Sequence, residues 1–378
     1  MENFIFHNPT KIYFGAGSIK YLSEEIKSVG HNVLLCYGGG SIKKSGLYDT
    51  VIEILKSSGK NIFELSGIMP NPRTDKVYEG IEICRKHKVD FILAVGGGST
   101  IDCAKMISVS AGDDRDFWQA FMIEKQRAKT SVPLATVLTN AATGSEMDHL
   151  AVITNWEKNI KNGYGDPLLQ PTFSILDPTY TYTLPKSQIL YGAIDIISHC
   201  MEEYFSAPDT SNLSDDIAEA IIKNVVYNLP LALENPENYI ARSNLMWDSS
   251  MAINSLIASG KKSDWQSHQI EHALSAFYDI PHGAGLAIIH PNYLRYISQS
   301  AENKLKRFAK NVWNETSALG GIEKMQAFFK EMGSPITLKE VNIPESALSK
   351  IAPTVNLVKN NYKPLTHDDV LKILYMSL

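Results

Sequence analysis

The sequence contains few cysteines. Only four occur among its 378 residues, at Cys36, Cys84, Cys103 and Cys200, and no two of them form a C-x-x-C pair. Cysteines that are so few and so far apart argue against a disulfide framework and against a structural zinc site built from thiolates.

Long apolar runs and clusters of positive charge are also missing. No stretch approaches the roughly 18 consecutive apolar residues of a membrane-spanning helix, and Met1 to Pro9 lacks the basic and apolar regions of a signal peptide. The formal net charge is −5 and the lysine-rich runs are short, which argues against a nucleic-acid or anionic-membrane partner. We therefore expect a cytoplasmic protein.

What is present is the composition of a large globular chain. Hydrophobic residues make up 44% of the sequence and charged residues 20%, which is ordinary for a folded protein. A chain of 378 residues exceeds the usual size of a single hydrophobic core, so two domains are expected.

The first half alternates strand-length apolar runs with amphipathic helical patterns such as 46–57 and 75–86. The apolar runs are 33–37, 61–65, 91–95, 134–138 and 173–176. This alternation predicts an α/β domain in which a mainly parallel sheet has helices on both faces.

After about Pro185 the pattern changes to one helical segment after another. Each has apolar positions with a 3.6-residue period, and strand-like runs are scarce. The segments are 187–205, 214–233, 240–259, 263–277, 301–313 and 321–332. The change predicts an α/β domain over residues 1–187 and an all-helical domain over residues 188–378.

Three strand ends in the first domain have the small and polar residues that suit a phosphate-bearing ligand. One run leads into Gly96-Gly97-Gly98-Ser99-Thr100 and then into a helix, whose free N–H groups attract anions. Thr139 to Glu146 follows another run and is similarly small and polar. Neither segment is a G-x-G-x-x-G fingerprint, and taken alone each is explained equally well as a tight turn or surface loop.

The third strand end bears on the choice of cofactor. Gly38 to Ser41 contains no carboxylate, and Lys43 and Lys44 follow just beyond it. An acidic residue near the adenosine ribose is typical of NAD sites. Because this turn has none, we expect NADP(H) to be preferred over NAD(H).

The helical half contains two pairs of chemically active residues with helical spacing. Asp195 and His199 are four residues apart among apolar neighbours, so they share one helix face. His268 and His272 have the same spacing, and His282 follows in a Pro-His-Gly loop. A solvated Asp–His pair on a helix surface is the alternative for the first pair. A converging carboxylate and imidazoles would bind a divalent metal such as Fe(II), Zn(II) or Mn(II).

These motifs together resemble the iron-containing (group III) alcohol dehydrogenases over nearly the whole chain. The ordered motifs are GGGSxxDxxK at 96–105, TGSE at 143–146, LDP at 176–178, D-x3-H at 195–199, H-x3-H at 268–272 and PHG at 281–283. Segments 37–49 and 176–185 look most like the NAD(P)H-dependent butanol dehydrogenases of that family.

The resemblance implies a dehydroquinate synthase-like fold with a dinucleotide-binding α/β domain, an all-helical metal-binding domain and an active site in the cleft between them. The metal ligands that it implies are Asp195, His199, His268 and His282. It places His272 beside the nicotinamide. The cofactor-binding residues that it implies are Gly39, Gly40, Ser41, Asn71, Gly97, Gly98, Ser99, Asp102, Thr139, Asn140, Thr143, Lys161 and Tyr180. Asn140 departs from the family, because many relatives have Thr-Thr-Ala-Gly where this chain has Thr-Asn-Ala-Ala at 139–142.

The activity implied is that of a metal-dependent, NAD(P)H-linked alcohol dehydrogenase or aldehyde reductase. Its substrates would be short to medium primary alcohols and aldehydes such as butanol and butanal, with one divalent ion, Fe(II) or Zn(II), polarising the carbonyl and His272 relaying a proton. A homodimer is implied as well.

Two alternatives remain open at this stage. A dehydroquinate-synthase-like lyase would need several cations around the metal for its phosphate-bearing substrate, and only Lys261 and Lys262 lie near these motifs. A non-enzymatic nucleotide-binding module would have no use for the Asp–His pattern.

Overall fold

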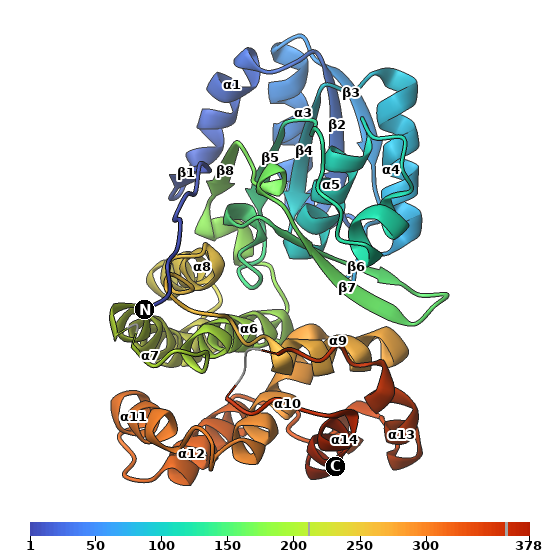
Figure 1. The fold of residues 1–378 in the computed structure, drawn as a ribbon. Coiled ribbons are helices and arrows are strands. Elements are labelled where there is room, and N and C mark those ends of the chain that lie inside the picture. Colours follow the sequence, from blue (N-terminus) through green and yellow to red (C-terminus); the bar gives the residue numbers. More distant parts are fainter. Residues whose placement is uncertain (211, 360–361) are drawn as a thin grey trace. The chain divides into compact units, whose positions relative to one another are not determined.

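The computed structural model describes residues 1–210, 212–359 and 362–378, and the chain divides into two compact units (Figure 1). The sheet unit comprises His7–Leu184 and Pro236–Ser250, and the helical unit comprises Met1–Phe6, Pro185–Asn235 and Met251–Leu378. The change of unit after Leu184 lies close to the boundary expected at residue 187.

The sheet unit contains a six-stranded sheet in the order β1-β8-β5-β4-β2-β3, and all neighbouring strands are parallel. Its strands are β1 (Lys11–Phe14), β2 (Asn32–Tyr37), β3 (Asn61–Leu65), β4 (Phe91–Gly96), β5 (Leu134–Leu138) and β8 (Phe173–Leu176). The predicted apolar runs coincide with all of these strands except β1. That strand was missed because it is short, lies at the sheet edge and is only partly buried.

The central strands are buried on both faces, which explains their continuous apolar runs. In β2, Val33 and Leu35 face one core, whereas Leu34 and Cys36 face the other. The first core includes residues of α1 (Leu22–Glu25) and α3 (Leu47–Ser57), and the second includes residues of α4 (Thr74–His87) and α5 (Gly98–Ser110). The sheet therefore lies between two helical layers, as predicted (Figure 1).

A separate antiparallel hairpin, which the sequence pattern did not reveal, is formed by β6 (Leu150–Asn155) and β7 (Ile160–Gly165). The sheet unit also includes the short helix α2 (Ser41–Lys44) and most of α8 (Tyr239–Ile253). We expected α8 in the helical domain and expected it to continue to residue 259. It joins the sheet unit because Arg242 binds the backbone oxygen of Thr181 at 2.6 Å and Ser250 donates to Glu146.

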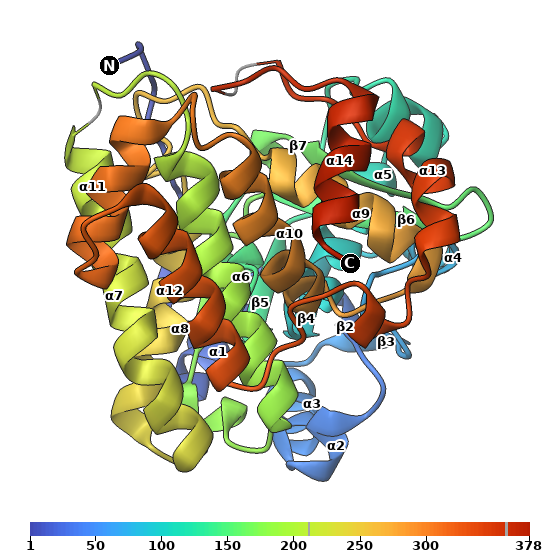
Figure 2. The ribbon, with the colours of Figure 1, turned by 90° about the horizontal axis from the view of Figure 1, so that it is seen from below.

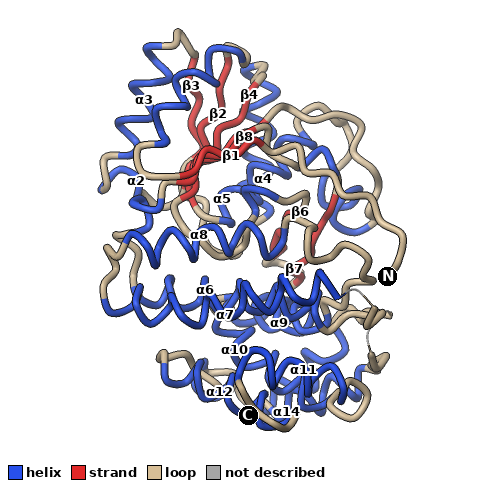
Figure 3. Tube along the Cα trace, turned by 90° about the vertical axis from the view of Figure 1, so that its left-hand side faces the viewer, coloured by secondary structure: helices blue, strands red, loops and turns tan. Residues whose placement is uncertain are grey.

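The helical unit has no strand among its described residues (Figures 2 and 3). Its helices are α6 (Lys186–Tyr204), α7 (Asn212–Glu234), α9 (Gln266–Tyr278), α10 (His282–Tyr296), α11 (Glu302–Trp313), α12 (Ala318–Glu331), α13 (Leu348–Ile351) and α14 (His367–Met376). Over the described ranges, no helix is both long and apolar enough to cross a bilayer. The cytoplasmic location stays a prediction.

One expectation about this unit was wrong. His282 was placed in a loop because proline and glycine flank it. It is instead the first residue of α10, with Pro281 at the N-cap. Gly283 is required there for close packing, since a Cβ at that position would lie 2.1 Å from the backbone oxygen of Tyr191 in α6.

Candidate metal centre and dinucleotide site

Helix α6 positions the first two candidate ligands. Asp195 and His199 lie one turn apart on it, and their exposed fractions are only 2% and 4%. The Nε2 atom of His199 lies 3.4 Å from Oδ1 of Asp195. The pair is therefore buried and convergent, which excludes the alternative of a solvated pair on the helix surface.

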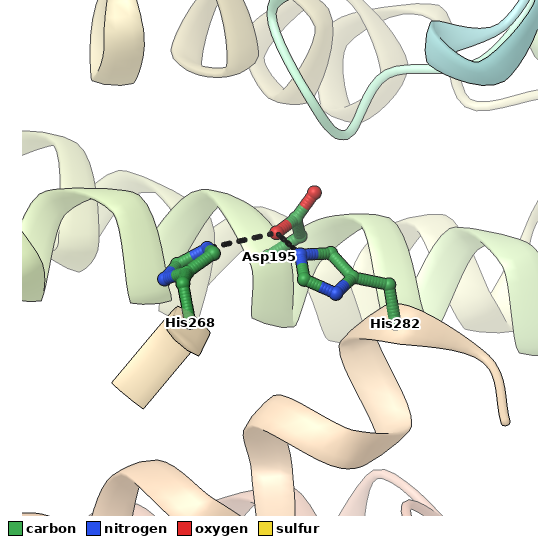
Figure 4. A group of neighbouring side chains, drawn as sticks. All are labelled: Asp195, His268 and His282. Carbon is green, nitrogen blue, oxygen red and sulfur yellow. Dashed lines mark ion pairs between the residues drawn. The ribbon is translucent and has the colours of Figure 1, made fainter. Parts of the chain in front are cut away.

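Helices α9 and α10 bring two more imidazoles to the same carboxylate oxygen (Figure 4). Nε2 of His268 lies 3.8 Å and Nε2 of His282 lies 3.5 Å from Oδ1 of Asp195. These spacings exceed those of good hydrogen bonds. Ligand atoms at about 2.0–2.1 Å from a tetrahedral ion would be about 3.4 Å apart, so the spacing fits a divalent metal.

The hydrogen-bonding state of these atoms also fits a metal. Among the described residues, Oδ1 of Asp195 and Nε2 of His268 are buried without a hydrogen-bond partner. Leaving buried polar atoms unsatisfied is costly, so a ligand at their common centre is the physical expectation. One carboxylate with three imidazoles is a donor set for Fe(II) or Zn(II).

The charges of the cluster are set by burial and by its own members. Burial opposes ionisation of Asp195, yet His199, His282 and His268 hold the pKa of its carboxyl well below the usual value. Burial lowers the pKa of His199 to about 4. At neutral pH Asp195 is thus ionised and His199 neutral, which are the forms that bind metals. For His268, Asp195 and Glu202 outweigh burial and raise the pKa to about 9.

His272 lies one turn beyond His268 on α9 and beside the cluster. Its ring centroid is 5.6 Å from that of His282 and 6.3 Å from that of His268. It is buried, and one ligand atom each from Glu271, His272 and His282 lie within 4.8 Å of one another. The structure therefore brings all five predicted residues of the helical half together.

Two buried carboxylates beside the cluster were missed by the sequence reasoning. Glu202 accepts a hydrogen bond from Nδ1 of His268 at 2.7 Å, and Glu271 is bonded to Nδ1 of His282. Both are acids on helix faces that are otherwise buried. An acid in such a position needs a partner, and this signal could have identified them.

In the sheet unit, the three glycine-rich or polar strand ends are neighbours. They follow β2, β4 and β5, which are adjacent in the sheet order, and the carboxyl ends of parallel strands share one edge. The chain runs from β2 to α3, whose buried residues belong to the core on one face of the sheet. It runs from β4 to α5, whose buried residues belong to the core on the other face. Open α/β sheets bind ligands outside such a switch point.

Close packing joins two of these strand ends. A Cβ at Gly98 would lie 2.2 Å from Oγ1 of Thr143, and one at Gly97 would lie 3.0 Å from Cβ of Asn140. The backbone N–H of Thr139 donates to the oxygen of Gly96 at 3.0 Å. Larger residues at Gly97 and Gly98 would push the segment that follows β4 away from the segment that follows β5. The sequence analysis predicted that these two segments bind the same ligand.

The remaining predicted cofactor residues are placed as follows. Nζ of Lys161 donates to Oδ1 of Asn71 at 3.0 Å, which joins the hairpin to the turn before α4. A Cβ at Gly39 or Gly40 would meet no atom of the described residues within 4 Å, so the backbone next to Ser41 is open. Ser99 lies in the first turn of α5.

Two of the predicted cofactor residues are engaged within the sheet unit. Asp102 accepts hydrogen bonds from Oγ of Ser145 at 2.6 Å and from the backbone N–H of Val152 at 2.9 Å, and burial raises its pKa to about 6. Tyr180 packs against the core that includes α3, and burial raises its pKa to about 12. Asp102 thus fixes the segment that follows β5.

Comparisons with known proteins agree with this geometry. The profile described as Iron-containing alcohol dehydrogenase matches residues 9–178, and that described as Fe-containing alcohol dehydrogenase family, C-terminal, matches residues 189–378. The chain is 44% identical to the Probable NADH-dependent butanol dehydrogenase 1 of Bacillus subtilis over the full length of both. It is 36% identical to the NADPH-dependent aldehyde reductase YqhD of Escherichia coli, over 92% of this chain and 91% of that protein.

A solved structure is similar throughout. The NADH-dependent butanol dehydrogenase A of Thermotoga maritima superimposes with a TM-score of 0.96 and is 41% identical, with 100% of this chain and 99% of that chain covered. The fold predicted from the sequence is thereby confirmed.

Proposed function

Because this chain belongs to the iron-containing alcohol dehydrogenase family, and is thus an NAD(P)-dependent oxidoreductase of alcohols and aldehydes, we propose that butanal and related aliphatic aldehydes are its substrates. The relatives from Bacillus subtilis and Thermotoga maritima are named butanol dehydrogenases, which supports this substrate class. The observation that supports a metal-dependent reaction at the carbonyl group is the convergence of three imidazoles on one oxygen of Asp195.

We propose Asp195, His199, His268 and His282 as the metal ligands. When bound, the metal supplies a Lewis acid for the carbonyl oxygen of the substrate. Asp195 contributes a negative charge that its imidazole neighbours keep ionised. His199 is held neutral by burial, so its lone pair is free for coordination at neutral pH.

His272 is proposed to move the proton. Reduction of an aldehyde by hydride leaves a negatively charged oxygen, and a protonated imidazole can donate a proton to it. The position of His272, one helical turn from His268 and with its ring 5.6 Å from that of His282, supports this role.

For the dinucleotide we propose the edge of the sheet at β2, β4 and β5, with NADP(H) preferred over NAD(H). The preference is supported by the turn at Gly39 to Ser41, which is open and carries no acid. Nζ of Lys43 lies 4.5 Å from the ring centroid of Tyr48, which keeps a cation close to this turn. Among the relatives, both NADH and NADPH occur as named cofactors. The proposed contact residues are Gly39, Gly40, Ser41, Asn71, Gly97, Gly98, Ser99, Asp102, Thr139, Asn140, Thr143, Lys161 and Tyr180.

A homodimer is also proposed. β1 is an edge strand of the sheet, and Phe14 at its end is 41% exposed and packs edge-to-face against the equally exposed Trp247. Strand edges with exposed aromatic residues favour pairing with another chain. Light scattering should give twice the mass of 42.0 kDa, and a monomer at micromolar concentration would contradict the proposal.

The rival lyase activity finds little support around the cluster. It would need free cations for a phosphate-bearing substrate, but Lys261 is buried against Asp215, with Nζ and Oδ1 2.5 Å apart. Lys262 lies 3.6 Å from Glu2 at the surface.

The test is oxidation of NADPH, followed by its absorbance, with aldehydes of increasing chain length. The protein is first stripped of metal and then assayed with and without Fe(II) or Zn(II). We expect metal-dependent turnover with butanal. Equal turnover in the presence of a strong chelator would contradict the metal-based mechanism, and no net NADPH oxidation with any aldehyde would contradict the activity.

A further inference from the structure

The three imidazoles of the candidate metal centre are oriented by different neighbours. His268 and His282 each bond a buried carboxylate through Nδ1. Within the described part of the chain, Nδ1 of His199 has no hydrogen-bond partner, and its ring stacks on that of His268 at a centroid distance of 5.1 Å. The two carboxylates have no role in the proposed reaction so far, although both are fully or almost fully buried.

Glu202 is bound to His268 twice. Its Oε1 atom accepts from Nδ1 of His268 at 2.7 Å and from the backbone N–H of the same residue at 2.9 Å. Because Nδ1 is engaged by this carboxylate, Nε2 is the ring nitrogen of His268 that is left to bind an ion.

Glu271 is fixed from three sides. Its Oε2 atom bonds Nδ1 of His282, and its Oε1 atom accepts from the hydroxyl of Ser275. Gly285 on α10 leaves the space for it, since a Cβ there would lie 2.7 Å from Cγ and 3.0 Å from Oε1 of Glu271. The absence of a side chain at Gly285 thus lets α10 pack closely against the carboxylate of Glu271, and this carboxylate holds the ring of His282.

We propose that Glu202 and Glu271 are positioning residues of the metal centre, which hold His268 and His282 with Nε2 directed at Oδ1 of Asp195. The inference rests on the ligand set proposed above. A carboxylate behind a ligating histidine fixes its tautomer and ring orientation and makes it a better donor. Loss of such a partner lowers metal affinity by about 10- to 100-fold.

The experiment is a titration of the full-length, metal-free protein with cobalt(II) in competition with a chromophoric chelator. The visible spectrum of the bound cobalt reports the geometry of the ligands, independently of turnover. We expect Glu271→Gln and Glu202→Gln each to weaken cobalt binding about 10- to 100-fold and to alter the spectrum. Unchanged affinity and spectrum in both variants would overturn the inference.

A matched control separates this role from a general need for buried acids. Glu219 is also buried in the helical unit, where it accepts from Tyr204 at 2.8 Å and from Arg307 at 2.7 Å. We expect Glu219→Gln to lower thermal stability but to keep the cobalt affinity and spectrum of the unmodified protein. Equal losses of affinity in all three variants would overturn the inference.

A second variant covers the case in which a glutamine variant fails to fold. Gly285→Ala removes no polar group but displaces Glu271, so it should weaken cobalt binding and change the spectrum in the direction of Glu271→Gln. Gly285→Ala with the affinity of the unmodified protein would count against the inference. Failure of the unmodified protein to bind one cobalt ion would instead refute the proposed metal centre.

Discussion

Nζ of Lys105 lies 2.5 Å from Oδ1 of Asp148, and both side chains are buried in the sheet unit. The same ammonium group donates to the backbone oxygens of Asp148 at 3.0 Å and Leu150 at 2.9 Å. The last residue of the GGGSxxDxxK motif thus binds α5 to the start of the β6–β7 hairpin. We infer that its role is to fix the architecture behind the proposed dinucleotide site.

We predict that Lys105→Met destabilises the protein strongly, because it leaves the carboxylate of Asp148 buried without its cation. Breaking one side of a buried pair costs about 3–5 kcal/mol, whereas a surface pair contributes less than about 1 kcal/mol. Urea unfolding of the metal-free protein measures the difference. The control is Lys76→Met, which removes an exposed pair with Glu79 of similar length, 2.7 Å. Equal stability of the two variants would disprove this account.

The burial of Glu146 leads us to predict that the free energy of unfolding depends on pH. It is fully buried, Ser250 donates to it, and burial raises its pKa from 4.5 to about 7. Between these values the folded state binds a proton that the unfolded state has released, so stability falls as the pH rises from about 4.5 to 7. Such a shift corresponds to roughly 3 kcal/mol.

Glu146→Gln should remove that dependence, since the amide does not titrate and can still accept from Ser250. We expect the variant to be more stable than the unmodified protein at pH 8 and similar to it at pH 4.5, as measured by urea unfolding. Glu53→Gln, at an exposed site on α3, should keep the original profile. A Glu146→Gln profile parallel to that of the unmodified protein would show that Glu146 is not the group responsible.

His268→Ala is expected to remove the metal and abolish turnover. The substitution deletes one donor and leaves Asp195 and Glu202 without the imidazole that lies between them. Dinucleotide binding, followed by fluorescence titration, should be largely unchanged because the predicted contacts lie in the sheet unit. The exposed His31 provides the control, and His31→Ala should retain metal and activity. Full activity of His268→Ala in metal-free buffer would refute the mechanism.

Ser41→Asp should reverse the preference for NADP(H). A carboxylate at the open turn would repel a 2′-phosphate and could bind the ribose hydroxyls of NAD(H). We expect the ratio of kcat/KM for NADPH to that for NADH to fall at least about tenfold, the equivalent of about 1.4 kcal/mol. Ser57→Asp adds the same charge at the end of α3 and should leave the ratio unchanged. A strong preference of the unmodified enzyme for NADH would already contradict the proposal.

The sequence predicted every strand that is buried throughout, and it also found the partly exposed edge strand β3. β2, β4, β5 and β8 are covered on both faces and read as plain apolar runs. β1 is a half-exposed edge strand of four residues and leaves no comparable signal. α10 was missed because Pro281 and Gly283 look like a turn, although one lies at the helix N-cap and the other packs against α6.

The sequence by itself determined the kinds and spacings of the reactive groups. A helix must place Asp195 and His199 on one face, and glycine-rich strand ends must expose backbone N–H groups, because both follow from local geometry. Only the tertiary structure decided that His268 and His282, which lie on two other helices, come close to Asp195. It also decided that Glu202 and Glu271 bind the Nδ1 atoms of these two histidines. Such contacts depend on how helices pack, and no local periodicity encodes which buried acid will meet which imidazole.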